Sequence, residues 1–422
     1  MAAVGGPPAA RERRLAALER FAASALPDAT LEDWRYSRIG DLDLGSYAPV
    51  AATVLAEAPE ALQALMASLS PAVSVVVGHG AAAPDGAGAG GRGEGVAGVT
   101  VEVDPAELEP FVLAEADAFG HLNAALGRPV VVRVAPGTRP SGPIVVLHWV
   151  AADGTAAFPR TRVEVGAGAE VSVVELVGSP DVDALCVPVT EIAAGDGAVV
   201  NYVTVQQLGP RVWQLGRQAS AVGRDATFTS SSVALGAGYG RLRTDSALVG
   251  KGGTSRLLAV YLGDGRRMVD FRTTQDHRAP NTTSELLFKG AVANRSHAVY
   301  TGLIRVDKGA RGTNAFQTNR NLVVHEGARA DSVPNLEIED NDVRCSHASA
   351  VGPIAPDQRF YLESRGVPPE MADRLITLGF LDEVLARTPV TSVVAHLRLE
   401  LLQRLDAAER AELAAELESV VA

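Results

Sequence analysis

Short β-branched runs separated by Gly and Asp fill the chain from about residue 129 to residue 354. Four of the clearest runs are Val130–Val132, Ile144–Leu147, Val163–Val165 and Val171–Val174. Such runs predict strands, because β-branched side chains pack well on a pleated surface. No amphipathic helix pattern interrupts them, whereas crossover helices join the parallel strands of a doubly wound sheet. The pattern therefore predicts an all-β unit and excludes a doubly wound α/β fold.

Turn-like segments recur in this region at a nearly constant spacing. Four of them begin at Gly166, Gly195, Gly223 and Gly250. Their starts are 29, 28 and 27 residues apart, and turns near residues 280 and 308 roughly continue the series. A regular period of this length with strands between the turns favours a solenoid, in which each coil stacks on the previous one. We therefore predict a parallel β-helix, with a β-sandwich of irregular hairpins as the alternative.

The N-terminal region, residues 1–128, is predicted to be helical around a flexible loop. Residues 9–25 place apolar side chains among charged ones at helical spacing, and residues 105–126 also have a helical pattern. Residues 78–98 are rich in Gly and Ala and predict a flexible loop between the helices. We interpret His79, at the edge of this segment, as a loop histidine.

The C-terminal region, residues 357–422, is predicted to be helical and to follow a β-helix core at residues 129–356. Pro368-Pro369 suits the start of a helix, because proline is tolerated in the first turn. The last predicted helix carries leucines at intervals of four residues, at Leu397, Leu401 and Leu405. One such apolar stripe is expected to pack on the protein, and a second, exposed stripe is available to a partner.

Composition limits the partners and the compartment. The 422 residues are 47% hydrophobic and 21% charged, as in an ordinary globular protein. A formal net charge of −12 argues against nucleic acid, which calls for a basic face. Two cysteines cannot build a disulfide framework, which favours a reducing compartment. No signal-peptide pattern and no apolar run long enough for a membrane span occur, so we expect a cytoplasmic protein without a membrane partner.

Cys345 and His347 are the strongest candidates for chemistry. In a strand, alternate side chains share a face, so that the two residues lie about 6.6 Å apart at a rise of roughly 3.3 Å per residue. A thiolate beside an imidazole suits iron or zinc. A tetrahedral site needs about four ligands, and the flanking sequence offers no second pair, so this is a half-site. The alternative is a buried cysteine and a hydrogen-bonded histidine in a core strand.

No catalytic residue is assigned to this chain. Gly250–Ser255 has the wrong spacing for a P-loop, so we expect no ATP site, and energy must come from a partner. Cys186 lies in an apolar run and is expected to be packed rather than reactive. The alternative is a β-helix enzyme acting on carbohydrate. Its candidate residues are Asp276, His277 and Arg278, or Asp264, Arg266 and Arg267.

Several motifs along the chain together resemble one family. They are Leu26-Pro27, Glu32–Tyr36, Asp276-His277, Pro280–Ser284, Lys289-Gly290, Ala315–Leu322, Pro334–Ile338, Asp342–His347, Val351-Gly352, Phe360–Gly366 and Gly379-Phe380. The combination resembles the SufB/SufD family of the SUF iron–sulfur cluster assembly system, and within it the SufD branch. The matches are densest from about residue 270 to residue 385.

The resemblance implies a fold, partners and a site. It implies a right-handed parallel β-helix flanked by α-helical N- and C-terminal regions. It also implies a heterodimer with a SufB-type paralogue through the β-helix, and a SufC-type ABC ATPase docked on the C-terminal helices. A transient iron–sulfur cluster shared with the SufB-type subunit is expected at the interface. His347 is then the ligand from this chain, with Cys345 beside it.

Two features separate the chain from the common family pattern. Ala348 follows His347 where the family usually has glycine, and alanine is tolerated there unless the position needs a positive φ. Glu339–Asp342 also differs from the usual sequence, which matters little on a surface turn. A SufB-like subunit is the alternative within the family. The run Phe360–Leu362 and the presence of only Cys186 besides Cys345 favour the SufD branch.

Overall fold

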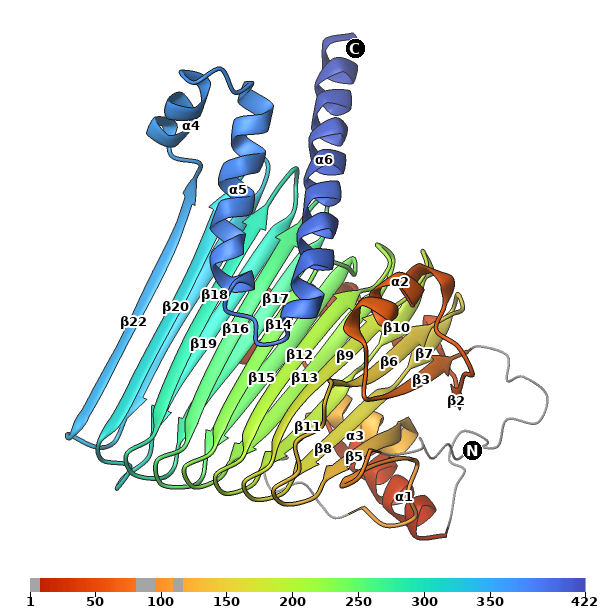
Figure 1. The fold of residues 1–422 in the computed structure, drawn as a ribbon. Coiled ribbons are helices and arrows are strands. Elements are labelled where there is room, and N and C mark those ends of the chain that lie inside the picture. The colour runs from red at the N-terminus through yellow and green to blue at the C-terminus, as the bar shows by residue number, and fades with distance from the viewer. Residues whose placement is uncertain (1–7, 81–95, 109–116, 422) are drawn as a thin grey trace.

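A parallel β-solenoid of about eight turns occupies residues 128–353 of the computed structural model, with helices at both termini (Figure 1). The structure describes residues 8–80, 96–108 and 117–421, with side chains as far as residue 411. The predicted parallel β-helix with flanking helical regions is confirmed, and the β-sandwich alternative is wrong, because strands of successive coils pair in parallel.

Two long sheets form the walls of the solenoid. The main path of the 12-stranded sheet contains β4 (Val99–Val103), β5 (Arg128–Val134), β8 (Pro159–Val165), β11 (Val189–Ala194), β13 (Trp213–Val222), β15 (Tyr239–Leu248), β17 (Met268–His277), β19 (His297–Val306) and β21 (Arg329–Ile338). Its side branch contains β1 (Ala48–Pro49), β7 (Thr155–Ala157) and β10 (Ala184–Cys186). The 10-stranded sheet contains β2 (Ala52–Val54), β3 (Val73–His79), β6 (Ile144–Val150), β9 (Glu170–Gly178), β12 (Val199–Gln207), β14 (Thr227–Ala234), β16 (Thr254–Gly263), β18 (Thr283–Val292), β20 (Thr313–Val323) and β22 (Val343–Pro353).

The period of the sequence arises from one turn position that needs a left-handed backbone. Gly168, Gly197, Asp225, Gly252 and Asn281 occupy this position in successive coils, with φ between 53° and 75°. Glycine adopts this conformation freely, and Asn and Asp tolerate it better than other residues. The N–H of each donates to a carbonyl of the following coil, so that the turns stack in register.

Helices cover parts of the outer faces of the solenoid. They are α1 (Pro8–Ala23), α2 (Glu60–Leu69), α3 (Ala118–Leu126), α4 (Pro356–Glu363), α5 (Pro369–Leu385) and α6 (Thr391–Val421). Helices α1 and α3 pack on each other near β5 and β8, far from β22 (Figure 1). The predicted helix over residues 105–126 begins later, at Ala118, and residues 109–116 lie outside the described part of the chain. Most of the predicted loop, residues 81–95, also lies outside it.

Helices α2, α5 and α6 pack on the outer face of the 10-stranded sheet and close a second apolar core there. From α6, the predicted stripe of Leu397, Leu401 and Leu405 is buried in this core. From α5, Leu381 and Val384 join it above β16 and β18. The first core lies in the lumen between the two sheets, where inward-facing side chains of every coil stack.

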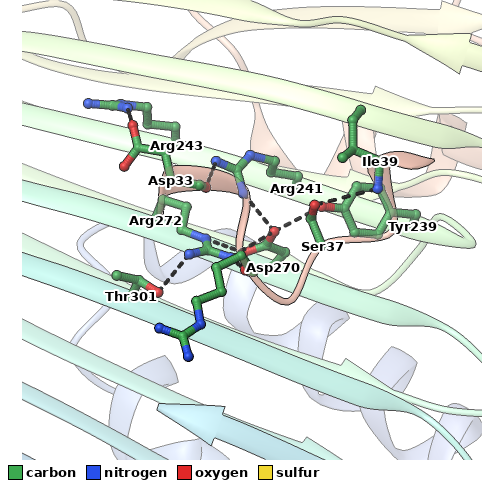
Figure 2. A network of polar contacts seen from close by, with 10 residues as sticks. Asp33, Ser37, Ile39, Tyr239, Arg241, Arg243, Asp270, Arg272 and Thr301 are labelled. Atoms are coloured by element: carbon green, nitrogen blue, oxygen red, sulfur yellow. Dashed lines mark hydrogen bonds and ion pairs between the residues drawn. The ribbon is translucent and has the colours of Figure 1, made fainter. Parts of the chain in front are cut away.

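A segment between α1 and β1 crosses the outer face of the 12-stranded sheet and is anchored there (Figure 2). The backbone carbonyl of Asp33 accepts from Arg241 Nη2, and that of Arg35 accepts from Arg272 Nη2, both at 2.6 Å. Trp34 is buried, with the Arg241 guanidinium 4.0 Å from its ring centroid. The aromatic and charged motif around Trp34 therefore serves local packing.

Asp270, on β17, holds the two arginines of this anchor in place. Its carboxylate accepts from Arg241 at 2.7 Å, from Arg272 at 2.6 Å and from the Tyr239 hydroxyl at 2.8 Å. Burial favours the neutral acid, but the two guanidinium groups hold the pKa of Asp270 below its ordinary value. One buried carboxylate thus offsets part of the charge of two buried guanidinium groups, whose other N–H groups donate to backbone carbonyls.

Candidate functional site

The last coil of the solenoid, formed by β21 and β22, has one uncovered side. Within the described residues, β21 pairs with β19 alone and β22 pairs with β20 alone, so each strand has a free edge (Figure 1). Most residues of β22 are exposed. Three large apolar side chains are exposed on these two strands, Leu336, Ile338 and Val351. An exposed edge strand with apolar neighbours is a template for pairing with another chain.

Cys345 and His347 lie on the face of β22 that continues the lumen. Cys345 is in register with Ala315, and His347 with Gln317, and both partners on β20 are buried in the lumen. Register partners in a sheet point to the same face. Cys345 and His347 therefore stack on Ala315 and Gln317 and extend two rows of lumen side chains to the last coil. The two residues therefore share one face of one strand, as their spacing predicted, and they do so on the uncovered side.

The two candidates differ in their surroundings. Cys345 is half-buried against an apolar cluster that includes Ile304 and Ala315, and burial raises the pKa of its thiol. His347 is exposed on the same strand. The reading of this pair as a buried cysteine and a bonded core histidine is therefore wrong for His347. Among the residues that the structure describes, no group of three or more His, Cys, Asp or Glu side chains could hold a metal ion.

Ala348 lies within β22 and is in register with Thr318, so the strand continues without the glycine that the family usually has there. Its φ is not positive. The turn before the strand is held by Asp340, whose carboxylate accepts from the backbone N–H of Gly309 and of Asp342. The departures from the family pattern therefore leave the strand and its turn intact.

A polar network that the sequence analysis missed supports the last coil from inside. The hydroxyl of Ser349 donates to that of Ser332 at 2.7 Å, and Ser332 donates to Asn319 Oδ1 at 2.8 Å. Asn319 in turn donates to the Tyr261 hydroxyl at 3.0 Å, and Asn321 donates to Asn319 at 2.7 Å. This network ties β22 and β21 to the interior across the lumen. Alternate polar residues in Gln317-Thr318-Asn319-Arg320-Asn321 were the available signal.

The residues considered for a carbohydrate enzyme have structural roles. His277 is buried in the lumen, where its ring contacts the hydroxyls of Thr282 at 2.7 Å and Ser284 at 2.8 Å. Burial lowers the pKa of His277 to about 4. Asp276 pairs with Arg278 at 2.7 Å on the outer face. Asp264 pairs with Arg267 at 2.7 Å within one turn, and Arg266 is exposed beside them. The structure does not bring these groups together around a cavity.

Cys186 is fully buried in an apolar cluster, as predicted. Burial, together with the charge of Glu175, raises the pKa of its thiol. A neutral, enclosed thiol is a poor nucleophile. Cys186 therefore belongs to the core.

His79 does not lie in a loop, so that interpretation was wrong. It ends β3 and is buried, with Nε2 3.2 Å from Nδ1 of His148. The other ring nitrogen of His148, Nε2, lies 3.0 Å from the Thr161 hydroxyl. Glu175 accepts hydrogen bonds from the hydroxyl of Thr190 at 2.7 Å and from that of Tyr202. Burial, and then the neighbouring His148, lowers the pKa of His79 well below its ordinary value. The parallel pairing of β3 with β6 brings the two histidines together, which a Gly-rich flanking sequence does not reveal.

Comparison with known proteins places the chain in a family. The family model described as SUF system FeS cluster assembly, SufBD core domain, matches residues 148–380, more than half of the chain. The chain belongs to the SufBD family. It is 32% identical over 307 residues to an iron–sulfur cluster assembly SufBD family protein of Mycobacterium tuberculosis, covering 70% of this chain and 75% of that protein.

Two SufBD relatives carry the name SufD. The iron–sulfur cluster assembly protein SufD of Escherichia coli is 29% identical over 373 residues, covering 87% of this chain and 86% of that protein. SufD of Bacillus subtilis is 32% identical over 216 residues, covering 51% of this chain and 49% of that protein. SufBD membership makes the chain a component of SUF iron–sulfur cluster assembly, and the SUF system implies partners of the SufB and SufC types. No helix in the described ranges could cross a membrane.

Proposed function

We propose that this chain is the SufD-type subunit of a SUF assembly complex. It pairs through β21 and β22 with a SufB-type paralogue, docks a SufC-type ATPase on its C-terminal helices, and presents His347 and Cys345 to a nascent cluster at the seam. The chain itself catalyses no reaction, and the cluster is cargo. The observation that carries the proposal is the placement of this pair on the uncovered last coil of the solenoid.

The shape of the last coil supports pairing with a paralogue. A solenoid buries its apolar lumen by stacking coils, so its terminal coil needs a cap or a further coil. Leu336 and Ile338 on β21, and Val351 on β22, are apolar side chains exposed at this end. A partner with the same coil shape can add one strand to each free edge and cover these side chains. Backbone hydrogen bonds then supply affinity, and alternate side chains supply specificity.

The donor set suits iron in a shared site. Neutral imidazole and thiolate are both iron ligands, and two of them leave room for ligands from a second chain. Because burial raises the pKa of the Cys345 thiol, its proton must leave when metal binds. An imidazole binds metal through the lone pair of its neutral form. We therefore assign His347 as the principal ligand and Cys345 as the supporting one.

The cysteine content favours the SufD role over the SufB role. A subunit that carries sulfur covalently needs an accessible thiolate. Cys186 is enclosed, and the pKa values of both thiols are raised by burial. The SufD names of the relatives from Escherichia coli and Bacillus subtilis agree with this assignment. Two free cysteines also suit a reducing, cytoplasmic location.

The C-terminal helices offer a second docking surface, which we call the helix patch. It consists of Phe360 and Tyr361 on α4, exposed by 72% and 58%, and Met371 and Leu375 on α5. Monomeric proteins rarely expose aromatic side chains together in this way without a partner. The opposite face of α5 packs on β16 and β18, so the patch is rigidly joined to the solenoid. We propose that the ATPase binds here.

The ligand role is tested by coexpressing the chain with its SufB-type and SufC-type partners and replacing His347 with alanine. Iron and acid-labile sulfide per complex are measured together with the mass of the intact assembly. We expect His347→Ala to keep the complex and lose most of the cluster. His121→Ala, which changes a half-buried histidine on α3, is the matched control. An intact His347→Ala complex with full cluster content eliminates the ligand role and leaves an architectural one.

A further inference from the structure

Gln317 is a buried polar side chain without a partner, directly beneath the candidate site. It is 1% exposed, and neither its amide nitrogen nor its amide oxygen has a hydrogen-bond partner among the described residues. An unpaired buried amide costs free energy of folding, so an evolved core normally satisfies it. Its persistence here indicates a partner that arrives with the assembled complex.

The neighbours of Gln317 indicate which partner this is. Gln317 faces the lumen. Its register neighbours are Leu286 on β18, in the preceding coil, and His347 on β22, in the last coil. Leu286 is apolar, so His347 is the neighbour in this column that can form a hydrogen bond. Adjacent strands lie about 4.8 Å apart, which a glutamine side chain bridges by rotating its terminal bonds.

The Gln317 amide lies close to Gly302 in the lumen. A Cβ at position 302 would collide with the Gln317 amide nitrogen and with the Tyr300 hydroxyl, so glycine at Gly302 makes room for the glutamine amide across the lumen. His347 is exposed on the other side. The amide nitrogen therefore fills the space that Gly302 leaves, and His347 lies one strand away in the same register column on the open side.

We propose that Gln317 is the positioning residue for His347. Its amide oxygen accepts a hydrogen bond from the imidazole N–H that does not face iron. This inference rests on the proposed ligand role of His347. A neutral imidazole has one N–H and one lone pair, so fixing the N–H also fixes which nitrogen binds the metal. Metal-binding histidines almost always donate their other N–H in this way, and the acceptor makes the ring a stronger donor.

Gln275 provides a matched control in the same lumen. It is also a buried glutamine facing inward, and one of its amide atoms also lacks a partner. Its amide nitrogen donates to the Ser284 hydroxyl at 2.7 Å. Its register neighbours are Ser246 and Ile304, neither of which binds metal. Replacing it with leucine also puts an apolar side chain in place of a lumen glutamine, at a position out of register with His347, and it is the harsher change because it removes a hydrogen bond as well.

The test uses the intact complex with its SufB-type and SufC-type partners, reconstituted with ferrous iron and sulfide. Gln317→Leu, Gln317→Glu, Gln275→Leu and His347→Ala are compared for the rate of cluster loss to a chelator and for the reduction potential of the cluster. We expect Gln317→Leu to lose the cluster about 10- to 100-fold faster, the usual effect of removing such a hydrogen bond. Its potential should rise, because the imidazole becomes a weaker donor. Gln317→Glu should lower the potential, and Gln275→Leu should match the unmodified complex.

The outcomes separate this inference from the proposed function. If His347→Ala loses the cluster while Gln317→Leu behaves as Gln275→Leu does, the positioning role is overturned and the ligand role survives. If His347→Ala changes neither cluster loss nor potential, both are overturned. A structural role for Gln317 predicts equal loss of cluster in the Leu and Glu variants and no opposite shifts in potential. Intact mass and thermal unfolding show that each variant is assembled, and replacing an unpaired amide with leucine should not destabilise the fold.

Discussion

Among single changes that conserve side-chain volume, Asp270→Asn is expected to be one of the most destabilising in the solenoid. The carboxylate forms ion pairs with the guanidinium groups of both Arg241 and Arg272, and all three side chains are buried. Asparagine keeps the shape and removes the charge, so two buried cations lose their counter-ion. Breaking a buried ion pair in this way typically costs about 3–5 kcal/mol, because an uncompensated charge remains inside.

The pH dependence of this anchor follows from the pKa of Asp270, which lies below its ordinary value in the folded chain. A carboxyl group with a lowered folded pKa stabilises the protein above its unfolded pKa, and this contribution is lost as the pH falls through the folded pKa. The difference in unfolding free energy between Asp270→Asn and the unmodified chain should therefore be full at pH 7. It should shrink in acid.

Urea unfolding followed by tryptophan fluorescence measures the change, since Trp34 lies on the anchored segment and packs on Arg241. Asp196→Asn is the control, because it breaks an exposed pair with Arg224 at 3.0 Å and should cost about 0–1 kcal/mol. Limited proteolysis should also cut the segment around Trp34 faster in Asp270→Asn. A loss of stability no larger than that of Asp196→Asn would refute the view that buried charge holds this segment.

Three further changes test the patch, the lumen packing and a buried histidine. The double change Phe360→Ser and Tyr361→Ser should weaken SufC-type ATPase binding at least tenfold in a titration and leave pairing with the SufB-type subunit unchanged. Gly290→Ala places a Cβ on the ring of Tyr261 and should cost about 1–3 kcal/mol in urea unfolding. His277 has a pKa lowered to about 4, so its neutral form stabilises the fold above its unfolded pKa and this contribution is lost as the pH falls. The loss should reach about 3 kcal/mol by pH 4, and His277→Gln should flatten the unfolding free energy over that range.

The sequence predicted the solenoid because its turns obey a local rule. Gly168, Gly197 and Gly252 need a positive φ, and Asp225 and Asn281 satisfy the same need in other coils. Such a rule is visible in a single sequence, since it acts on one residue per coil. The strands between the turns then follow from their β-branched composition.

Features that depend on pairing between distant coils were not visible. The sequence predicts a loop position for His79, because a Gly-rich segment follows it. It is buried beside His148, 69 residues away, because β3 and β6 pair in parallel. The network from Ser349 to Tyr261 likewise joins three coils. The polar and apolar pattern within one strand predicts which face of the sheet a side chain occupies. It does not predict which residue of another coil that side chain contacts.

The contrast between His277 and His347 shows that the same residue type can be buried in one coil and exposed in another. Both histidines lie on strands of the solenoid and face the lumen. His277 has coils on both sides, so it is buried, neutral and bonded to Thr282 and Ser284. His347 has a coil on one side only within the described chain, so its ring is exposed. Stacking encloses a histidine that lies between two coils and leaves a histidine of the last coil exposed, which is the position that the proposed ligand role of His347 requires.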